Sequence, residues 1–360
     1  MASGLTEAAV LDALQTIRDP DLNRDIVSLK FVKNLRIDGD RVAFTIELTT
    51  PACPVKDQMR EQARAVVGAL PGVAAVDIEM TAQVRSTVGA DLGKAPVAGI
   101  KNIIAVGAGK GGVGKTTVAV NLAIALSQSG GRVALLDGDI YGPNVPIMLG
   151  IQTQLTTDGT KIVPAVQYGI QLVSMAFLTG DDAPVIWRGP MLHGVIQQFF
   201  REVRWDAVDY LIVDMPPGTG DVALSLSQTV PVSGAVVVTT PQTVSLADTR
   251  RAVRMYQKLN VPILGLVENM SHFVCPSCQH ESDIFGKGGG ETLAAELSIA
   301  FLGRIPIDEP IRIGGDTGVP IAIGAPKSAA SRAFRAAAER LAAQLSIASY
   351  RRPIPLTPVS

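Results

Sequence analysis

Short, unbroken runs of apolar residues recur from about residue 102 to about residue 305 of the chain. They do not alternate with polar residues, so they are typical of strands that are buried on both faces of a sheet. Helical stretches separate several of the runs, which indicates repeated βαβ units and an α/β fold with a doubly wound, mostly parallel sheet. The runs are NIIAVGA, RVALLD, IQLVSM, DYLIVDM, GAVVVTT, PILGLVE and IAFLGRI.

A different pattern occupies residues 1–85. A helical period near the start of the chain stops by Pro20, and the segments VKNLRID and RVAFTIELT then follow on either side of a short turn rich in Asp and Gly. That combination predicts a β-hairpin. A helix over 55–69 and a strand over 73–79 are expected next. We therefore expect a small α+β domain ahead of the α/β domain.

The composition between these two patterns marks a boundary. Residues 86–100 are rich in Gly, Pro and small side chains and have no sustained period, which predicts a linker. The α/β domain then spans 101–350 and ends in a helix over about 327–348 with a narrow apolar face. Residues 351–360 are broken by prolines and are predicted to form a flexible tail.

Length and charge narrow the classes of partner. The chain has 360 residues, enough for about two domains, and a formal net charge of −1. That charge and the 4% aromatic content argue against a nucleic-acid binder, which usually has a basic excess or stacking aromatics. No apolar run reaches the ~18 residues of a membrane-spanning helix, and the first residues lack the basic start of a secretory signal. We expect a cytoplasmic protein that binds neither membranes nor nucleic acids.

The strand NIIAVGA leads directly into a glycine-rich loop and then into the apolar helix VAVNLAIALS. This is the G-x-x-x-x-G-K-T motif in its required place between a strand and a helix, and it predicts a P-loop NTPase. Backbone N–H groups of such a loop surround phosphate oxygens, the Lys115 ammonium reaches the β- and γ-phosphates, and the Thr116 hydroxyl ligates Mg²⁺. The predicted nucleotide-binding residues of the loop are Gly109, Lys110, Gly111, Gly112, Val113, Gly114, Lys115, Thr116 and Thr117.

Three carboxylates follow two of the predicted strands. Asp137 and Asp139 come at the end of RVALLD, and Asp214 ends DYLIVD. Ligands bind at the carboxyl edge of an open α/β sheet, where a buried carboxylate needs a partner such as Mg²⁺. We predict that Asp214 is the Walker B acid, that Asp139 positions the attacking water and that Asp137 supports the metal shell. Helix capping is the alternative role for Asp137 and Asp139.

The chain has only three cysteines: Cys53 alone, and the pair Cys275-x-x-Cys278. Such sparse, clustered use suits metal or redox chemistry in a reducing compartment. The pair is typical of a redox site, of half a zinc site or of half an iron–sulfur site, and a two-fold dimer would supply four thiolates. A thioredoxin-like pair is less favoured because it belongs at a helix N-terminus. His272 and His280 lie nearby, either as further metal ligands or as ordinary residues of a surface loop.

The segment KGGVGKT, which includes Lys110, resembles the deviant Walker A ATPases, the group of MinD, ParA and the nitrogenase iron protein. The resemblance implies a dimer in which Lys110 reaches the nucleotide of the partner chain; a solvated charge is the alternative. It also implies that Asn269, after PILGLVE, recognises adenine, with a simple turn residue as the alternative. ATP is favoured over GTP because no guanine-recognition motif follows a late strand.

Motifs throughout residues 100–350 resemble the Mrp/ApbC family of P-loop ATPases, which are iron–sulfur cluster carriers. The segments DPDLNRDIVSLKFVKNLRI and LTTPACPVKDQM resemble the small iron–sulfur assembly domain that is often fused to them. The motifs that carry the family resemblance are GKGGVGKTTVAVNLA, LLDGDIYGPNVP, WRGPM, LIVDMPPGTGDVALS, TTPQTVSLAD, ENMSHFVCPSC and IFGKGGG.

This resemblance implies that Cys275 and Cys278 of two chains bridge a labile [4Fe–4S] cluster. It further implies slow ATP hydrolysis coupled to transfer of the cluster between scaffold proteins and recipient apoproteins. Cys53 matches the cysteine of the assembly domain, which implies that it handles iron or a cluster; a buried structural thiol is the alternative. Two other functions remain open: a MinD/ParA-type positioning ATPase, and an ATPase with a structural zinc at its dimer interface.

Overall fold

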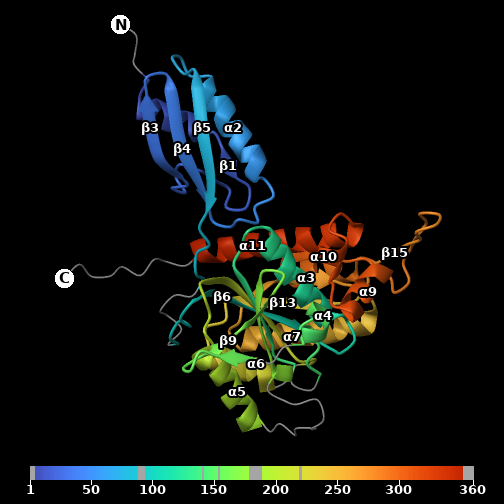
Figure 1. Ribbon diagram of the computed structural model, residues 1–360. Helices are drawn as coiled ribbons and strands as arrows, with labels where there is room; N and C mark the ends of the chain where they lie inside the picture. The colour runs from blue at the N-terminus through green and yellow to red at the C-terminus, as the bar shows by residue number, and fades with distance from the viewer. Residues whose placement is uncertain are drawn as a thin grey trace.

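An eight-stranded sheet forms the centre of the computed structural model (Figure 1). The strand order is β10-β11-β7-β12-β6-β13-β14-β17, and all neighbours are parallel except β10 and β11. The strands are β6 (Ile100–Ala108), β7 (Val133–Asp137), β10 (Ala165–Gln167), β11 (Ile170–Ser174), β12 (Val208–Asp214), β13 (Gly234–Thr239), β14 (Ile263–Glu268) and β17 (Phe301–Arg304). The structure describes residues 5–87, 94–139, 142–152, 155–177, 189–218 and 221–351. The predicted doubly wound, mostly parallel sheet is confirmed.

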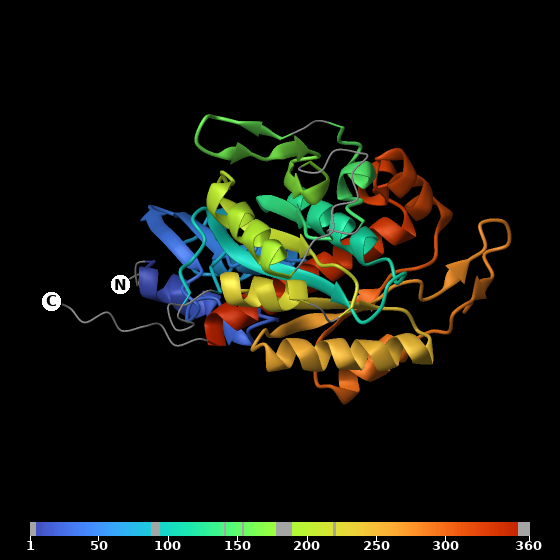
Figure 2. The same cartoon turned by 90° about the horizontal axis from the view of Figure 1, so that it is seen from below.

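Helices cover both faces of this sheet, as Figure 2 shows. Every residue of β7, β12 and β13 is buried, which explains why these strands are unbroken apolar runs. Helices α3 (Lys115–Gln128) and α11 (Ala329–Arg351) pack on one face, in one apolar core with the short α10 (Ile321–Gly324). On the other face lie α5 (Gly189–Glu202), α6 (Asp221–Thr229) and α7 (Thr243–Lys258).

Several short elements of two to nine residues have no counterpart in the prediction, because such short segments show too few turns or alternations to reveal a period. The predicted final helix over 327–348 corresponds to α11, so the first residue of the predicted tail is helical; the rest of that tail lies outside the described residues. The additional elements are α4 (Val145–Leu149), β8 (Thr156–Thr157), β9 (Ile162–Val163), β15 (Phe273–Val274), β16 (Glu281–Ser282), α8 (Gly289–Glu296) and α9 (Glu309–Thr317).

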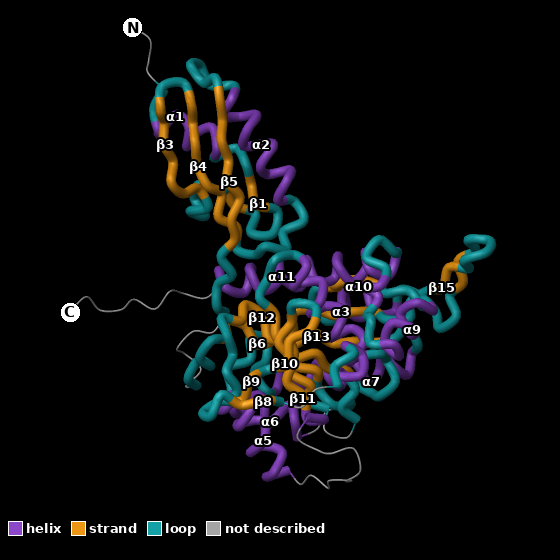
Figure 3. Tube along the Cα trace, viewed as in Figure 1, coloured by secondary structure: helices purple, strands orange, loops and turns teal. Residues whose placement is uncertain are grey.

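The N-terminal segment forms a separate three-stranded sheet in the order β3-β4-β5, with two helices on one side (Figure 3). The predicted hairpin, helix and following strand are all present, within a few residues of the expected bounds. The elements are α1 (Glu7–Leu14), β1 (Arg18–Asp19), β2 (Arg24–Asp25), β3 (Val32–Asp38), β4 (Arg41–Leu48), α2 (Lys56–Gly68) and β5 (Ala75–Ala82).

The loop after β4 contacts the α/β domain at the amino end of its sheet. The hydroxyls of Thr50 and Tyr210 lie 3.0 Å apart in a buried hydrogen bond, and Tyr210 is near the start of β12. Ala52, 4% exposed, belongs to the same apolar core as α3 and α11. The Arg85 guanidinium stacks over the Tyr350 ring at 4.6 Å from its centroid. The small domain is thus docked on the edge opposite to the phosphate loop.

The start of the predicted linker is tied to the large sheet. The backbone N–H and the hydroxyl of Thr87 both donate to the side-chain oxygen of Asn102, each at 3.0 Å, and the Ser86 hydroxyl donates to the carbonyl of Lys101. Asn102 is fully buried in β6. The chain therefore reaches its first central strand along an anchored path, although residues 88–93 lie outside the described part.

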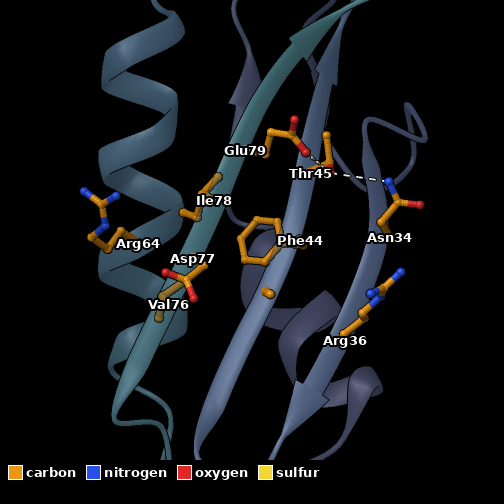
Figure 4. A pocket seen from close by; sticks show the side chains of 10 residues that line it. Asn34, Arg36, Phe44, Thr45, Arg64, Val76, Asp77, Ile78 and Glu79 are labelled. Atoms are coloured by element: carbon orange, nitrogen blue, oxygen red, sulfur yellow. Dashed lines mark hydrogen bonds between the residues drawn. The ribbon is translucent and has the colours of Figure 1, made fainter.

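A hollow of about 720 Å³ lies along the three strands of the N-terminal sheet (Figure 4). Its charged lining residues are mixed in sign, with Arg36 and Arg64 against Asp77 and Glu79. It includes none of the predicted site residues. All the residues that line it belong to the N-terminal domain, so this hollow is separate from the nucleotide site predicted at the carboxyl edge of the large sheet (Figure 4).

Candidate functional site

The phosphate loop lies between β6, in the middle of the large sheet, and the first turn of α3. Gly112 and Gly114 both have a φ of +79°, a left-handed conformation that favours glycine. A Cβ on Gly114 would lie 2.2 Å from the amide nitrogen of Asn269. The first N–H groups of α3 have no partner within their own helix and point into the loop, which makes an anion site.

Lys115, Thr116 and Asp214 form a connected group beneath this loop. The Lys115 ammonium donates to one oxygen of the Asp214 carboxylate at 2.6 Å, and the Thr116 hydroxyl donates to the other at 2.7 Å. Asp214 is fully buried at the end of β12; burial raises its pKa and the neighbouring ammonium opposes that rise. One hydroxyl and one carboxylate side by side are ligands that suit Mg²⁺, which keeps several waters of its own.

Asp137 lies at the end of the adjacent strand, directly opposite Asp214 in the register of β7 and β12. Its fully buried carboxylate accepts hydrogen bonds from the Ser174 hydroxyl at 2.9 Å and from the N–H groups of Val145 and Asp139 at 3.2 Å. Burial, with the charge of Asp214 second, raises the pKa of Asp137 to about 7.

These contacts bear on the predicted roles of the carboxylates. Val145 is the first residue of α4, so Asp137 binds a helix-start N–H as the capping alternative expected. Among the described residues no three His, Cys, Asp or Glu side chains converge on one metal position. Thr116 and Asp214 are suited to hold Mg²⁺ here, while the roles of Asp137 in the metal shell and of Asp139 in positioning water stay predictions.

Asn269 and Lys110 are two further predicted site residues at the phosphate loop, and their contacts differ. The buried Asn269 amide donates to the Val113 carbonyl at 2.8 Å and so holds the loop from the end of β14. Recognition of adenine by Asn269 stays a prediction. The half-buried Lys110 ammonium forms no ion pair or hydrogen bond with any residue that the structure describes, so its charge is available to another molecule.

The cysteine pair lies at the tip of the hairpin formed by β15 and β16, which extends away from the body in Figures 1 and 2. The turn is closed by hydrogen bonds from the Cys275 N–H to the His280 carbonyl and from the Gln279 N–H to the Cys275 carbonyl, both at 2.9 Å. Backbone N–H groups of Cys278 and Ser277 also donate to the Cys275 sulfur and lower its pKa below the ordinary value. The turn thus favours a thiolate, the form that binds metals.

Comparison with known proteins decides between the families that share this loop. Residues 99–342 match the family described as NUBPL iron-transfer P-loop NTPase, and residues 7–78 match a family described as iron-sulfur cluster assembly protein. The chain belongs to the NUBPL iron-transfer P-loop NTPase family. The resemblance to cluster-carrier ATPases, first seen in the motifs, is confirmed.

Relatives of this NUBPL-family chain match it over nearly its whole length. The iron-sulfur cluster carrier protein of Synechocystis is 49% identical over 96% of this chain and 99% of its own. The protein of that name from Escherichia coli K12 is 40% identical over 94% of this chain and 92% of its own.

Solved structures resemble the α/β domain. A nucleotide-binding protein from Archaeoglobus fulgidus in complex with ADP is 35% identical and covers 62% of this chain and 88% of its own, with a TM-score of 0.56. The cell division ATPase MinD of Pyrococcus furiosus is 27% identical and covers 67% of this chain and 98% of its own, with a TM-score of 0.51. These neighbours confirm the P-loop NTPase fold of the NUBPL-family chain.

The two histidines near the cysteine pair add no third ligand. Within the described residues, neither His272 nor His280 joins Cys275 and Cys278 in a group that would hold a metal. The role of both histidines, as further ligands or as loop residues, stays a prediction. No helix of the described part is long and apolar enough to cross a membrane.

Cys53 has a different environment from the pair. It is partly buried against the core of the small domain, and burial raises its pKa to about 11. At neutral pH its thiol is therefore protonated, which favours the structural alternative over a metal ligand in this arrangement.

Glu268, the fully buried last residue of β14, is not among the site residues predicted from the sequence. A signal for it exists: like Asp214, it is a carboxylate at the end of an apolar run, and it directly precedes Asn269. The buried Ser174, which donates to Asp137, was also missed, and no pattern in its surroundings marks it.

Proposed function

We propose that this chain is an ATP-dependent iron–sulfur cluster carrier that works as a homodimer. Cys275 and Cys278 of two chains would together hold a [4Fe–4S] cluster as cargo, which the dimer receives from scaffold proteins and passes to recipient apoproteins. Nucleotide hydrolysis at the phosphate loop would accompany loading or release. The sparse use of cysteine suits a reducing compartment such as the cytoplasm.

The cysteine hairpin carries this proposal. It presents two thiols at an exposed tip, with N–H donors that favour the thiolate of Cys275. Soft thiolates suit iron–sulfur clusters, and such clusters usually take four of them. One chain offers two thiols in its hairpin, so a second copy related by a two-fold axis is the simplest source of the other two.

Exposed apolar side chains support the same dimer. Ile147 in α4, Leu224 in α6 and Val244 in α7 are 61%, 41% and 69% exposed. Each lies near the start of a helix that follows a central strand, which places all three at the carboxyl edge of the sheet with the phosphate loop. A face that combines exposed apolar residues with a polar site is typical of an interface. The Lys110 ammonium, which has no partner among the described residues, would then face the partner's nucleotide.

The residues at the loop divide the nucleotide chemistry among them. The loop N–H groups and Lys115 would bind the phosphates, and Thr116 with Asp214 would hold Mg²⁺. Bound Mg²⁺ supplies positive charge that offsets the charge of the phosphates. Lys115 and Thr116 both contact Asp214, so nucleotide binding must rearrange these pairs to free the ammonium for the phosphates.

Anaerobic reconstitution with iron and sulfide tests the proposal. The expected product is a brown protein with a broad band in the blue-violet and about four irons per dimer. Cys275→Ser should abolish the band, whereas Cys53→Ser, a matched control elsewhere in the chain, should keep it. A colourless wild-type protein that retains zinc would refute the carrier proposal and favour an ATPase with a structural zinc at its dimer interface. A colourless, metal-free protein would also refute it and would favour the positioning ATPase.

A further inference from the structure

A buried carboxylate that the nucleotide chemistry does not use lies at the end of β14. Glu268 is fully buried, and its two oxygens accept three hydrogen bonds. The Ser271 hydroxyl donates at 2.7 Å and the Gly288 N–H at 3.0 Å to one oxygen, and the Gly290 N–H donates at 2.6 Å to the other. The Arg304 guanidinium lies 3.6 Å away and supplies a compensating charge.

These donors come from both legs of the cysteine hairpin. Ser271 is on the chain that leads from β14 into β15, and Gly288 and Gly290 are on the chain that returns from β16 into α8. One side chain therefore fixes the base of the hairpin from both sides. The backbone adds to this, because the Ile305 N–H donates to the Glu268 carbonyl and the Ile307 N–H to the His272 carbonyl.

The next residue along the chain joins the same base to the phosphate loop. Asn269 donates to the Val113 carbonyl within the loop, and its own N–H donates to the Thr239 carbonyl at the end of β13. Two consecutive residues thus connect the nucleotide site with both legs of the hairpin. A change in the conformation of the loop therefore has a short path, through these hydrogen bonds and the backbone between Asn269 and Glu268, to the base of the hairpin that carries the cysteines.

We infer that Glu268 is a positioning residue that couples the state of the phosphate loop to the cysteine hairpin. This inference rests on the proposed function for its purpose. When nucleotide changes the conformation of the loop, Asn269 moves with it and displaces the adjacent Glu268. The hydrogen bonds of Glu268 then shift both legs of the hairpin together.

The rate of alkylation of Cys275 and Cys278 by iodoacetamide measures the coupling in the full, metal-free, reduced chain. Each cysteine is followed by peptide mass spectrometry, with and without saturating Mg·ATP. In the wild type we expect nucleotide to slow alkylation of the pair by about fivefold or more, the lower end of usual coupling between sites. Cys53, docked on the opposite edge of the sheet, should keep its rate.

Glu268→Gln keeps the size of the side chain and replaces one acceptor oxygen by a donor, so the clamp loses at least one of its bonds. The nucleotide effect on the pair should fall to a ratio near one. Glu291→Gln, which alters an exposed carboxylate of α8 that pairs with Arg304, is the matched control and should keep the wild-type ratio. A fluorescent ADP analogue shows that each variant is saturated with nucleotide.

Gly290→Ala disturbs the same hydrogen bond at its donor, and it serves as the test of the coupling if Glu268→Gln does not fold. Its Cβ would lie 3.0 Å from the Glu268 side chain, and it should also bring the ratio near one. A wild-type protein without a nucleotide effect, or a folded Glu268→Gln protein with the full effect, would overturn the inference. The assay contains no iron or sulfide, so its outcome is independent of whether the chain carries a cluster.

Discussion

Cys53 and Cys275 should differ in their rate of alkylation and in how that rate depends on pH. Burial raises the pKa of Cys53 to about 11, whereas N–H donors lower the pKa of Cys275 below that of an ordinary thiol. Since only the thiolate reacts, the reactive fraction at pH 8 is about one in a thousand for Cys53. For Cys275 it exceeds the fraction of an ordinary thiol, which is about one in ten or more. Ionisation alone therefore favours Cys275 by at least about a hundredfold at this pH.

Intrinsic nucleophilicity works in the other direction. A thiolate of higher pKa attacks faster, with a Brønsted slope of about 0.4–0.5. A pKa difference of about two units therefore makes the Cys53 thiolate about six- to tenfold more reactive than the Cys275 thiolate. The net advantage of Cys275 is then at least about tenfold before access is considered. Access increases it further, because Cys53 is packed against the core of the small domain and Cys275 lies on a projecting hairpin.

The assay is iodoacetamide labelling from pH 7 to pH 10, with each cysteine quantified by peptide mass spectrometry. The rate for Cys53 should rise about tenfold per pH unit up to pH 10, because that range lies below its pKa. The rate for Cys275 should level off at a lower pH than that of an ordinary thiol, because its pKa is lowered. In denaturant the two rates should become similar. If Cys53 levelled off below pH 9, or reacted as fast as Cys275 in the folded protein, the structural reasoning would be wrong.

Three further predictions concern the nucleotide site and the domain contact. Burial raises the pKa of Asp137 to about 7, and bound Mg·nucleotide should favour its charged form. Nucleotide binding at pH 7 should therefore release about half a proton. Calorimetry would detect this release as a binding enthalpy that depends on the buffer, and Asp137→Asn should remove that dependence. Lys110→Ala should retain nucleotide binding but lower ATP hydrolysis by about a hundredfold, the usual effect of one lost charge-stabilising group; unchanged turnover would count against a role across the dimer. Thr50→Val removes the partner of the Tyr210 hydroxyl and the acceptor of the Ala52 N–H. It should therefore cost about 2 kcal/mol in denaturant unfolding, against about 1 kcal/mol for Tyr210→Phe; equal stability of both variants and wild type would contradict the docked arrangement.

Local patterns were sufficient to predict most of the architecture. Strands such as β12 and β13 are buried along their whole length, so their apolar runs are unbroken and cannot be mistaken for half-exposed strands. The phosphate loop was also predictable, because its function requires glycine, Lys115 and Thr116 at fixed spacing within one continuous segment. The pairing of Lys115 and Thr116 with Asp214 follows from the same motif once the strands are placed.

Contacts between distant segments were not predictable from such patterns. The Glu268 clamp joins residues about 20 positions apart through two backbone N–H groups, which leave no trace in the identity of their side chains. The bond between Thr50 and Tyr210 spans 160 positions and depends on how the small domain docks. Cys53 illustrates the consequence: its sequence context suggests metal chemistry, but its environment, created by tertiary packing, protonates the thiol.

The position of the dock limits how Cys53 and the cysteine pair can cooperate. Thr50 contacts Tyr210 at the amino end of β12. The hairpin with Cys275 follows the carboxyl end of β14, a strand of the same sheet that runs parallel to β12, so it lies at the opposite edge. Within one chain in this arrangement the two sites therefore lie at opposite edges of the sheet, and no shared metal position joins them among the described residues. A handover of iron between Cys53 and the pair must then run between two molecules, or follow release of the small domain from its dock. Release alone would leave Cys53 packed against the core of the small domain, so the burial that raises its pKa would persist.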